Sequence, residues 1–269
     1  MQKKLLYCLL IVLSVFNSCS NEELSPSENT ILPKTLKTIY PNSPSENYDT
    51  NFIYDGNKIV CITNKNGKRD YEYDGNHIMK ETVYSFYKGI ETKDSETLFT
   101  YENDKLKTAT KLVSDKATKY VYHYNDDGSI NIETYNLYSD AEKESKKTEK
   151  EVITIVDGNI VKSEYNSGDD YDVISIVKYE YDTSKNAFKN IMGLNLLLNQ
   201  FSLDYETSLS SNNNMKRYYV NNIQGPLSNK IFEPHWLKME YEYDKKGYPT
   251  KKTTYDYTEE IKEVNVYVY

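Results

Sequence analysis

The chain has 269 residues and a formal net charge of −8, with 38% apolar and 28% charged residues. The apolar share is low, but 28 Tyr compensate for it, since Tyr suits a pleated sheet and keeps its hydroxyl in water. The length allows one large β domain or two small ones. An acidic chain repels phosphate backbones, so we expect no nucleic-acid partner.

Residues 1–18 have the organisation of a secretory signal. Lys3 and Lys4 form its positive start. Leu5 to Phe16 form a 12-residue apolar run, which is shorter than the ~20 residues that span a bilayer as a helix. Removal of this segment takes away both lysines and makes the mature chain more acidic still.

Phe16-Asn17-Ser18-Cys19 resembles the lipobox of bacterial lipoproteins, although Phe16 and Asn17 depart from its usual Leu and small residue. The resemblance implies cleavage before Cys19, lipidation of its thiol and attachment to a membrane. An ordinary cleaved signal followed by an incidental Cys is the alternative. With Cys8 removed and Cys19 lipidated, only Cys61 remains, so the mature chain forms no intramolecular disulfide.

Residues 19–34 are rich in Ser, Glu, Asn and Pro, which is typical of a disordered tether. The tether begins with Ser20-Asn21-Glu22-Glu23, which resembles the acidic export signal of surface lipoproteins in the Bacteroidota. This resemblance implies an outer-membrane lipoprotein exposed at the cell surface. Without that signal, the protein would face the periplasm.

One phrase recurs along the rest of the chain: two large residues two positions apart, an acidic residue, a polar turn and then an apolar residue. Each phrase predicts a hairpin, because Asp-Gly and related turns between alternating segments favour tight β-turns. The seven copies are FIYDGNKI (52–59), YEYDGNHI (71–78), FTYENDKL (99–106), YHYNDDGSI (122–130), ITIVDGNI (153–160), YEYDTSKNAF (179–188) and YEYDKKGYP (241–249).

The anchor residues of the copies are unevenly spaced, whereas a solenoid or propeller needs a nearly fixed period. Seven hairpins imply ~12–14 strands, more than an open twisted sheet usually holds flat. We therefore predict a mainly β domain over residues 35–269, built as a large antiparallel meander sheet that is curled or divided into two segments. The anchors are Tyr54, Tyr73, Tyr101, Tyr124, Val156, Tyr181 and Tyr243.

One stretch has a different period. Ile191, Leu194, Leu198 and Phe201 recur at three- and four-residue steps, which predicts a short helix near residues 187–201. A helix of about three turns is marginal alone, so we expect it to dock on the concave face of the curled sheet.

The phrase resembles the YD repeats of Rhs-type proteins, most clearly in Tyr241-Glu242-Tyr243-Asp244-Lys245-Lys246-Gly247. With the insert from Tyr181 to Asn190 and the Leu-rich stretch after it, residues 35–269 are similar to a family of Bacteroidota lipoproteins whose domain has no assigned function. The resemblance implies an antiparallel sheet with one helical insert. It carries over no catalytic residues.

The chain shows no pattern of a nucleophile with a base, a metal site or a phosphate loop. His77, His123 and His235 each lack a second ligand at metal-binding spacing, so we expect no cofactor and no metal. We predict a non-enzymatic cell-envelope lipoprotein that binds a protein partner or a glycan through a Tyr-bearing face, unless Tyr only packs the sheet. The alternative is a structural accessory subunit of an outer-membrane complex, and an enzyme is the least favoured class.

Overall fold

The computed structural model describes residues 30–137, 144–166, 174–201, 211–223 and 235–269. Sixteen strands form one antiparallel sheet in which each strand pairs with the next in sequence. The prediction of a mainly β domain is confirmed. The strands are β1 Thr35–Ile39, β2 Tyr48–Asp55, β3 Lys58–Asn64, β4 Gly67–Asp74, β5 His77–Tyr87, β6 Ile90–Glu102, β7 Lys105–Val113, β8 Lys116–Tyr124, β9 Ser129–Leu137, β10 Glu144–Val156, β11 Asn159–Asn166, β12 Ile174–Lys185, β13 Asn213–Ile223, β14 His235–Tyr243, β15 Pro249–Tyr255 and β16 Ile261–Val268.

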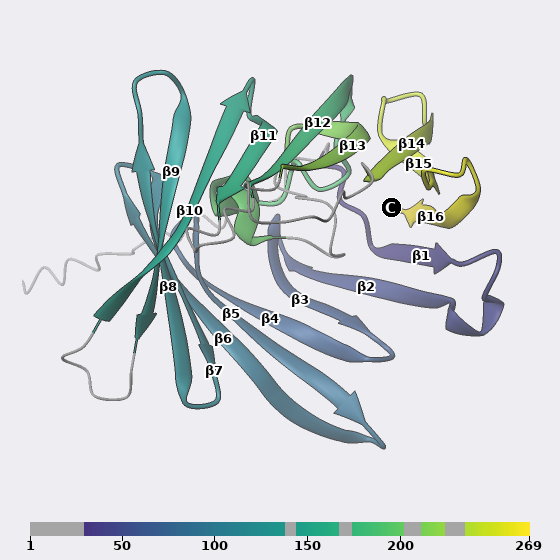
Figure 1. The fold of residues 1–269 in the computed structure, drawn as a ribbon. Coiled ribbons are helices and arrows are strands. Elements are labelled where there is room, and N and C mark those ends of the chain that lie inside the picture. Colours follow the sequence, from purple (N-terminus) through teal and green to yellow (C-terminus); the bar gives the residue numbers. More distant parts are fainter. Residues whose placement is uncertain (1–29, 138–143, 167–173, 202–210, 224–234) are drawn as a thin grey trace, which may run out of the picture.

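The sheet closes into a barrel (Figure 1), so the prediction of an open sheet, curled or in two segments, is wrong. The seven phrases lie at every second connection, from β2–β3 to β14–β15, and β1 and β16 carry no phrase. These two strands pair with each other, from Thr35 opposite Val268 to Ile39 opposite Val264. Closure removes the exposed edges that an open sheet of this size would present to other chains.

All seven phrases lie at one end of the barrel, which we call the repeat end. Consecutive strands run in opposite directions, so every second connection returns to the same end. The tight turns need positive φ, which glycine adopts without strain, as at Gly56 (φ +61°) and Gly75 (φ +54°). The repetition of the phrase therefore gives one end of the barrel a ring of similar turns.

The anchor Tyr of one phrase bonds the backbone of the apolar residue in the phrase before it. Three hydroxyls donate to a carbonyl oxygen, and the Tyr73 hydroxyl accepts from the Ile59 amide. Burial raises the pKa of Tyr124 and Tyr181 to about 12. These Tyr act as cross-links between neighbouring hairpins. The pairs are Tyr73 with Ile59 at 3.2 Å, Tyr101 with Ile78 at 2.7 Å, Tyr124 with Leu106 at 3.0 Å and Tyr181 with Ile160 at 2.8 Å.

The fifth phrase differs from its predicted alignment. Ile155 pairs with Ile160 just as Tyr54 pairs with Ile59, so Ile155 is the anchor there. Val156, the predicted anchor, lies one residue further on and is 50% exposed. The turn of this phrase is shifted by one residue, because Asp157 itself adopts positive φ (52°) beside Gly158.

The predicted helix lies inside the barrel (Figure 1) as residues 186–201, which we call the plug. It consists of turns followed by a 3-10 helix, η2 Leu194–Gln200, and a second short 3-10 helix, η1 Pro44–Glu46, lies elsewhere. Leu198 has non-helical dihedrals (φ 53°, ψ −120°), so a continuous α-helix does not form. No described helix is long and apolar enough to cross a membrane.

The plug and the barrel wall share one apolar core. Phe188 packs on Phe52 of β2 with ring centroids 5.3 Å apart, and Phe201 packs on Tyr71 of β4 at 6.1 Å. The buried wall residues are spread over many strands, which shows that the apolar rows face inward. They include Phe52, Ile59, Ile62, Tyr71, Ile78, Phe99, Leu106, Ala109, Tyr122, Ile130, Ile132, Ile153 and Ile160.

Both ends of the described chain lie at the repeat end. Pro33 is fully buried and accepts a bond from the Tyr54 hydroxyl, and Asn190 of the plug donates to the Ile31 carbonyl at 2.9 Å. At the other terminus, the Tyr269 hydroxyl donates to the carbonyl oxygen of Pro249, the last residue of the seventh phrase. The plugged end is therefore the end at which the described chain begins and ends.

Candidate ligand-binding cavity

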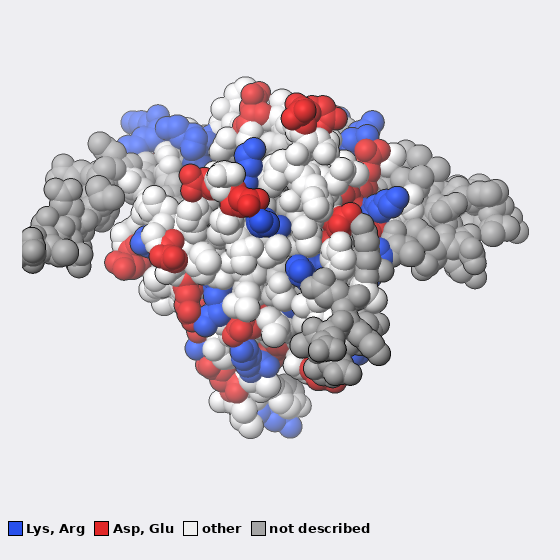
Figure 2. Space-filling model, turned by 90° about the vertical axis from the view of Figure 1, so that its left-hand side faces the viewer, with Lys and Arg blue, Asp and Glu red and all other residues white. Residues whose placement is uncertain are grey.

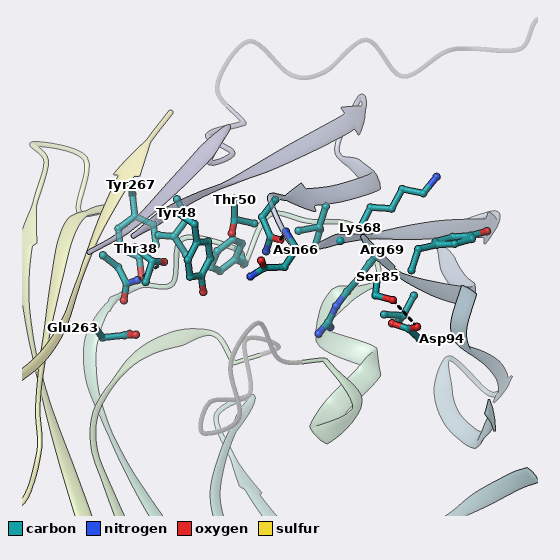
Figure 3. Close-up of a pocket in the computed structure, with 18 of the residues that line it drawn as sticks. Thr38, Tyr48, Thr50, Asn66, Lys68, Arg69, Ser85, Asp94, Glu263 and Tyr267 are labelled. Atoms are coloured by element: carbon teal, nitrogen blue, oxygen red, sulfur yellow. Dashed lines mark hydrogen bonds between the residues drawn. The ribbon is translucent and has the colours of Figure 1, made fainter. Parts of the chain in front are cut away.

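A polar cavity of about 230 Å³ lies inside the barrel on the side of the plug away from the repeat end (Figure 3). Phe188 of the plug forms its floor. Asn66, in the turn between β3 and β4, lines the cavity and is exposed, so the cavity reaches the surface there. Its size is somewhat below the ~300–1,000 Å³ of drug-sized sites, which suits a small ligand.

The cavity exists because the inward rows of several strands change from apolar to polar along their length. Alternate residues of a strand face the same side, so each row can be read in steps of two. The change occurs on neighbouring strands at similar depth. The rows are Leu36 and Thr38 on β1, Phe52, Thr50 and Tyr48 on β2, Ile62 and Asn64 on β3, Tyr71 and Arg69 on β4, and Tyr267, Asn265 and Glu263 on β16.

Most charged groups of this region form ion pairs, whereas Asp94 accepts a bond from Ser85 Oγ at 2.9 Å. Lys252 and Glu263 form an ion pair at 3.2 Å, and their side chains are only 10% and 13% exposed. Arg69 lies 3.4 Å from Glu81, which also accepts a bond from the Tyr71 hydroxyl at 2.9 Å. A charged ligand would have to compete with these pairs, and breaking a buried pair is costly.

Two buried oxygens near the Lys252–Glu263 pair have no hydrogen-bond partner among the described residues: Oδ1 of Asn265 and Oγ1 of Thr254. Asn265 is only 3% exposed, and its Nδ2 donates to Thr38 Oγ1 at 3.1 Å. Buried polar atoms are normally satisfied, because an unmet partner costs about 1–3 kcal/mol. Such an acceptor can take a hydrogen bond from water or from another donor outside the chain.

A second buried polar group joins the plug to the wall. Glu151 on β10 accepts from Ser163 Oγ at 3.1 Å and from Nδ2 of Asn199 in the plug at 3.3 Å. The Tyr122 hydroxyl donates to Asn199 Oδ1 at 2.9 Å. Burial raises the pKa of Glu151 despite these bonds. This carboxylate is used in docking the plug.

The residues singled out in the sequence lie elsewhere. Cys19 is outside the described residues. Cys61 lies on β3 beside Asp70, and burial raises its thiol pKa to about 11, which disfavours a nucleophilic role. His77 pairs with Asp104 at 3.0 Å, and His123 pairs with Glu133 at 3.4 Å. No group of three metal-ligating side chains occurs in the described part of the chain.

The repeated turns of the sequence do not point to the cavity residues. The Tyr side chains that line the cavity include Tyr48 and Tyr267, which belong to no phrase. The signal that could have found them is the loss of apolar character along an inward row, as in Phe52, Thr50 and Tyr48. That these rows meet in one place follows only from the pairing of β1 with β16.

These features define a closed sixteen-stranded antiparallel barrel with an internal plug and a polar cavity. A similar fold occurs in a porin-like protein from Bacteroides vulgatus, with a TM-score of 0.50 and 11% identity over 89% of this chain and 99% of that one. A porin-like protein from Bacteroides uniformis also matches, with a TM-score of 0.44 and 11% identity over 91% and 99% of the two chains.

No protein-family model and no curated protein match the chain. The resemblance to YD repeats and to a Bacteroidota lipoprotein family therefore stays a prediction. At 11% identity, the likeness to the Bacteroides vulgatus structure shows the fold alone.

Proposed function

We propose that the chain is a non-enzymatic, lipid-anchored protein of the cell envelope whose barrel stands in water beside the membrane and binds a small glycan in the interior cavity. The observation that carries this proposal is that the polar cavity ends on the plug, with Phe188 as its floor. A polar cavity that is closed at one end by the plug is better suited to binding a ligand than to letting the ligand pass through the barrel.

The charged outer surface of the barrel supports the proposal that the barrel lies in water and does not span the bilayer. Spanning barrels carry an apolar outer band ~25 Å tall, and a Lys or Arg on the lipid face costs ~2–4 kcal/mol at the bilayer midplane. Here ion pairs line the outside, and charges of both signs are scattered over the face in Figure 2. Examples are Lys162 with Glu164 at 2.8 Å, Lys251 with Glu242 at 2.9 Å, and Lys80 with Glu72.

The proposed anchor fits the position of the chain ends. The described chain begins at the plugged repeat end, where Pro33 is buried against the Tyr54 hydroxyl. An extended chain covers at most ~3.3–3.6 Å per residue, so lipid on Cys19 would hold this end near the membrane surface. The polar cavity then faces away from the membrane, toward dissolved ligands.

The barrel offers a better binding site for a glycan in its cavity than for a protein strand added to the edge of its sheet. Closure leaves no free edge among the described strands, so a partner cannot add a strand there. The cavity offers hydroxyls, amides and the rings of Tyr48 and Tyr267, which are groups that bind sugar hydroxyls and ring faces. The repeat Tyr are less suited to binding, because their hydroxyls already bond the backbone of neighbouring hairpins.

A second candidate is an accessory subunit that contacts a protein partner. The tip of the long β5–β6 hairpin (Figure 1) carries Tyr87 and Ile90, which are 69% and 66% exposed. Large apolar side chains at the tip of a projecting hairpin favour a protein contact. Exchanging both for Ser should abolish co-purification with an envelope complex if this candidate is right, and leave glycan binding unchanged.

The test uses the mature chain with Cys19→Ala, titrated calorimetrically with methyl glycosides of glucose, galactose, mannose and N-acetylglucosamine. We expect saturable binding of at least one glycoside, unchanged in the outer-wall control Ile53→Thr. Binding to none of them by a folded protein would contradict the glycan proposal. In cells, Cys19→Ala should release the protein from membranes, and continued membrane association would contradict the anchor.

A further inference from the structure

Four inward side chains of β15 and β16 form a compact group, which we call the β15–β16 quartet: Lys252, Thr254, Glu263 and Asn265. All of them except Thr254 line the cavity. The register places Lys252 opposite Asn265 and Thr254 opposite Glu263. Directly opposed residues of an antiparallel pair have Cβ atoms ~4.5–5.5 Å apart. The Lys252–Glu263 ion pair runs along the diagonal of this group at 3.2 Å.

We infer that the quartet is the recognition point for two adjacent hydroxyls of a neutral sugar ring. This inference rests on the proposed function and names the ligand class of the same cavity. One hydroxyl accepts a bond from the Lys252 ammonium, and the next donates to the Glu263 carboxylate. The hydroxyl that accepts from Lys252 also supplies the donor that Asn265 Oδ1 lacks, because the other hydroxyl gives its only proton to Glu263.

The first argument is the state of Asn265. Its side chain is 3% exposed and lines the cavity, while its Oδ1 has no partner among the described residues. Its Nδ2 is engaged by Thr38 Oγ1 at 3.1 Å, which fixes the amide plane. The free oxygen therefore needs a donor, and a hydroxyl can donate to it while accepting from a neighbour.

The second argument is charge. Lys252 and Glu263 compensate each other, and Arg69 across the cavity is compensated by Glu81. At the quartet, an anionic sugar would meet Glu263 and a cationic ligand would meet Lys252, and in each case the opposite charge is already paired. Neutral hydroxyls can bond both members without separating them, and bonds to charged groups are stronger than neutral ones.

The third argument is the arrangement around the quartet. Figure 3 shows Glu263, Thr38 and Tyr267 gathered on one side of the cavity, with Tyr48 beside them and Arg69, Ser85 and Asp94 on the far side. Tyr267 packs edge-on against Phe188 of the plug at 6.3 Å, so its ring is held in place. A ring fixed beside hydrogen-bonding groups can stack on the apolar face of a sugar.

The experiment compares the best-binding methyl glycoside with deoxy analogues that lack one ring hydroxyl at a time. In the wild-type chain, removal of either of two adjacent hydroxyls should weaken binding ~10-fold or more. In Glu263→Gln, binding of the parent glycoside should fall by a similar factor, and one of these two deoxy analogues should lose no further affinity. Ile53→Thr on the outer wall should keep the wild-type pattern.

Several outcomes are separable. If no glycoside binds the wild-type chain, the proposed function fails. If glycosides bind but Glu263→Gln and Asn265→Ala keep the wild-type deoxy pattern, the proposed function stands and this inference is wrong. Tighter binding of glucuronic acid than of the neutral glycoside would also overturn it. If a variant fails to fold, the deoxy series in the wild-type chain still tests the inference, which is wrong if no two adjacent hydroxyls contribute to binding.

Discussion

The two ends of the barrel interior differ in their side chains: one end is apolar and the other is polar. At the repeat end, Phe188 and Phe201 of the plug fill the space between apolar rows from many strands. Beyond the plug, the same rows carry Thr50, Asn64 and Arg69 around a cavity of about 230 Å³. The difference suggests that the apolar end supplies most of the folding free energy, while the polar end remains available for a ligand.

The largest loss of stability is expected when a buried side chain of the plug is truncated. Phe188→Ala should lower the free energy of unfolding by ~3–5 kcal/mol, because a fully buried ring is replaced by a cavity. Denaturant unfolding followed by circular dichroism would measure the loss. The matched outer-wall change Ile53→Ala should cost far less, and equal losses at the two positions would break the comparison.

The Tyr cross-links are expected to contribute less. Tyr101→Phe removes a 2.7 Å bond to the Ile78 carbonyl while keeping the ring, so the loss should be ~0.5–1.5 kcal/mol. Chemical denaturation gives this value directly. Tyr87→Phe, at an exposed hairpin tip, serves as the control and should leave the stability unchanged. A loss below the error of the control would mean that the cross-links are not stabilising.

The Glu151 carboxylate joins plug and wall and should make stability depend on pH. Burial raises its pKa in the folded state, so the folded chain holds this proton more tightly than the unfolded chain. Stability therefore falls as pH rises from the unfolded pKa through the folded one. Glu151→Gln keeps an acceptor for Ser163 and Asn199 and should remove this fall. Thermal melts of both chains between pH 4 and pH 8 measure it, and parallel curves would contradict the assignment.

The smallest effect on stability is expected in the cavity. Thr50→Val keeps the side-chain shape at a buried position on the polar wall and removes one hydroxyl. Its free energy of unfolding should change by less than about 1 kcal/mol, because the added apolar burial offsets the lost hydroxyl. Denaturant unfolding is again the measurement, with Phe188→Ala run beside it. A loss comparable to that of Phe188→Ala would show that the polar end also carries the fold.

Much of the wall could be predicted from the sequence. The phrase couples same-side large residues to a turn residue, and both are local properties, so hairpins such as Tyr54 to Ile59 form as expected. The anchor of the fifth phrase was misplaced by one residue, because Asp157 takes a positive φ that the aligned Asp55 does not. Such a shift depends on turn geometry, which the pattern of residue types leaves open.

The cavity was not predictable in the same way. Its polar residues stand in inward rows that the sequence shows, but the sequence does not say which rows face one another. The bond between Asn265 and Thr38 joins residues 227 positions apart. Such a contact is made only when β1 meets β16, and neither strand carries the repeated phrase.

The sequence by itself determined the strands, most of their turns and the apolar character of residues 186–201, because these depend on side-chain alternation and local turn chemistry. The tertiary structure decided that the sheet closes, that the apolar segment becomes an internal plug with a 3-10 turn, and that polar row ends meet in one cavity. Closure is a property of the whole sheet: it depends on the tilt and stagger accumulated over sixteen strands, which no single hairpin specifies.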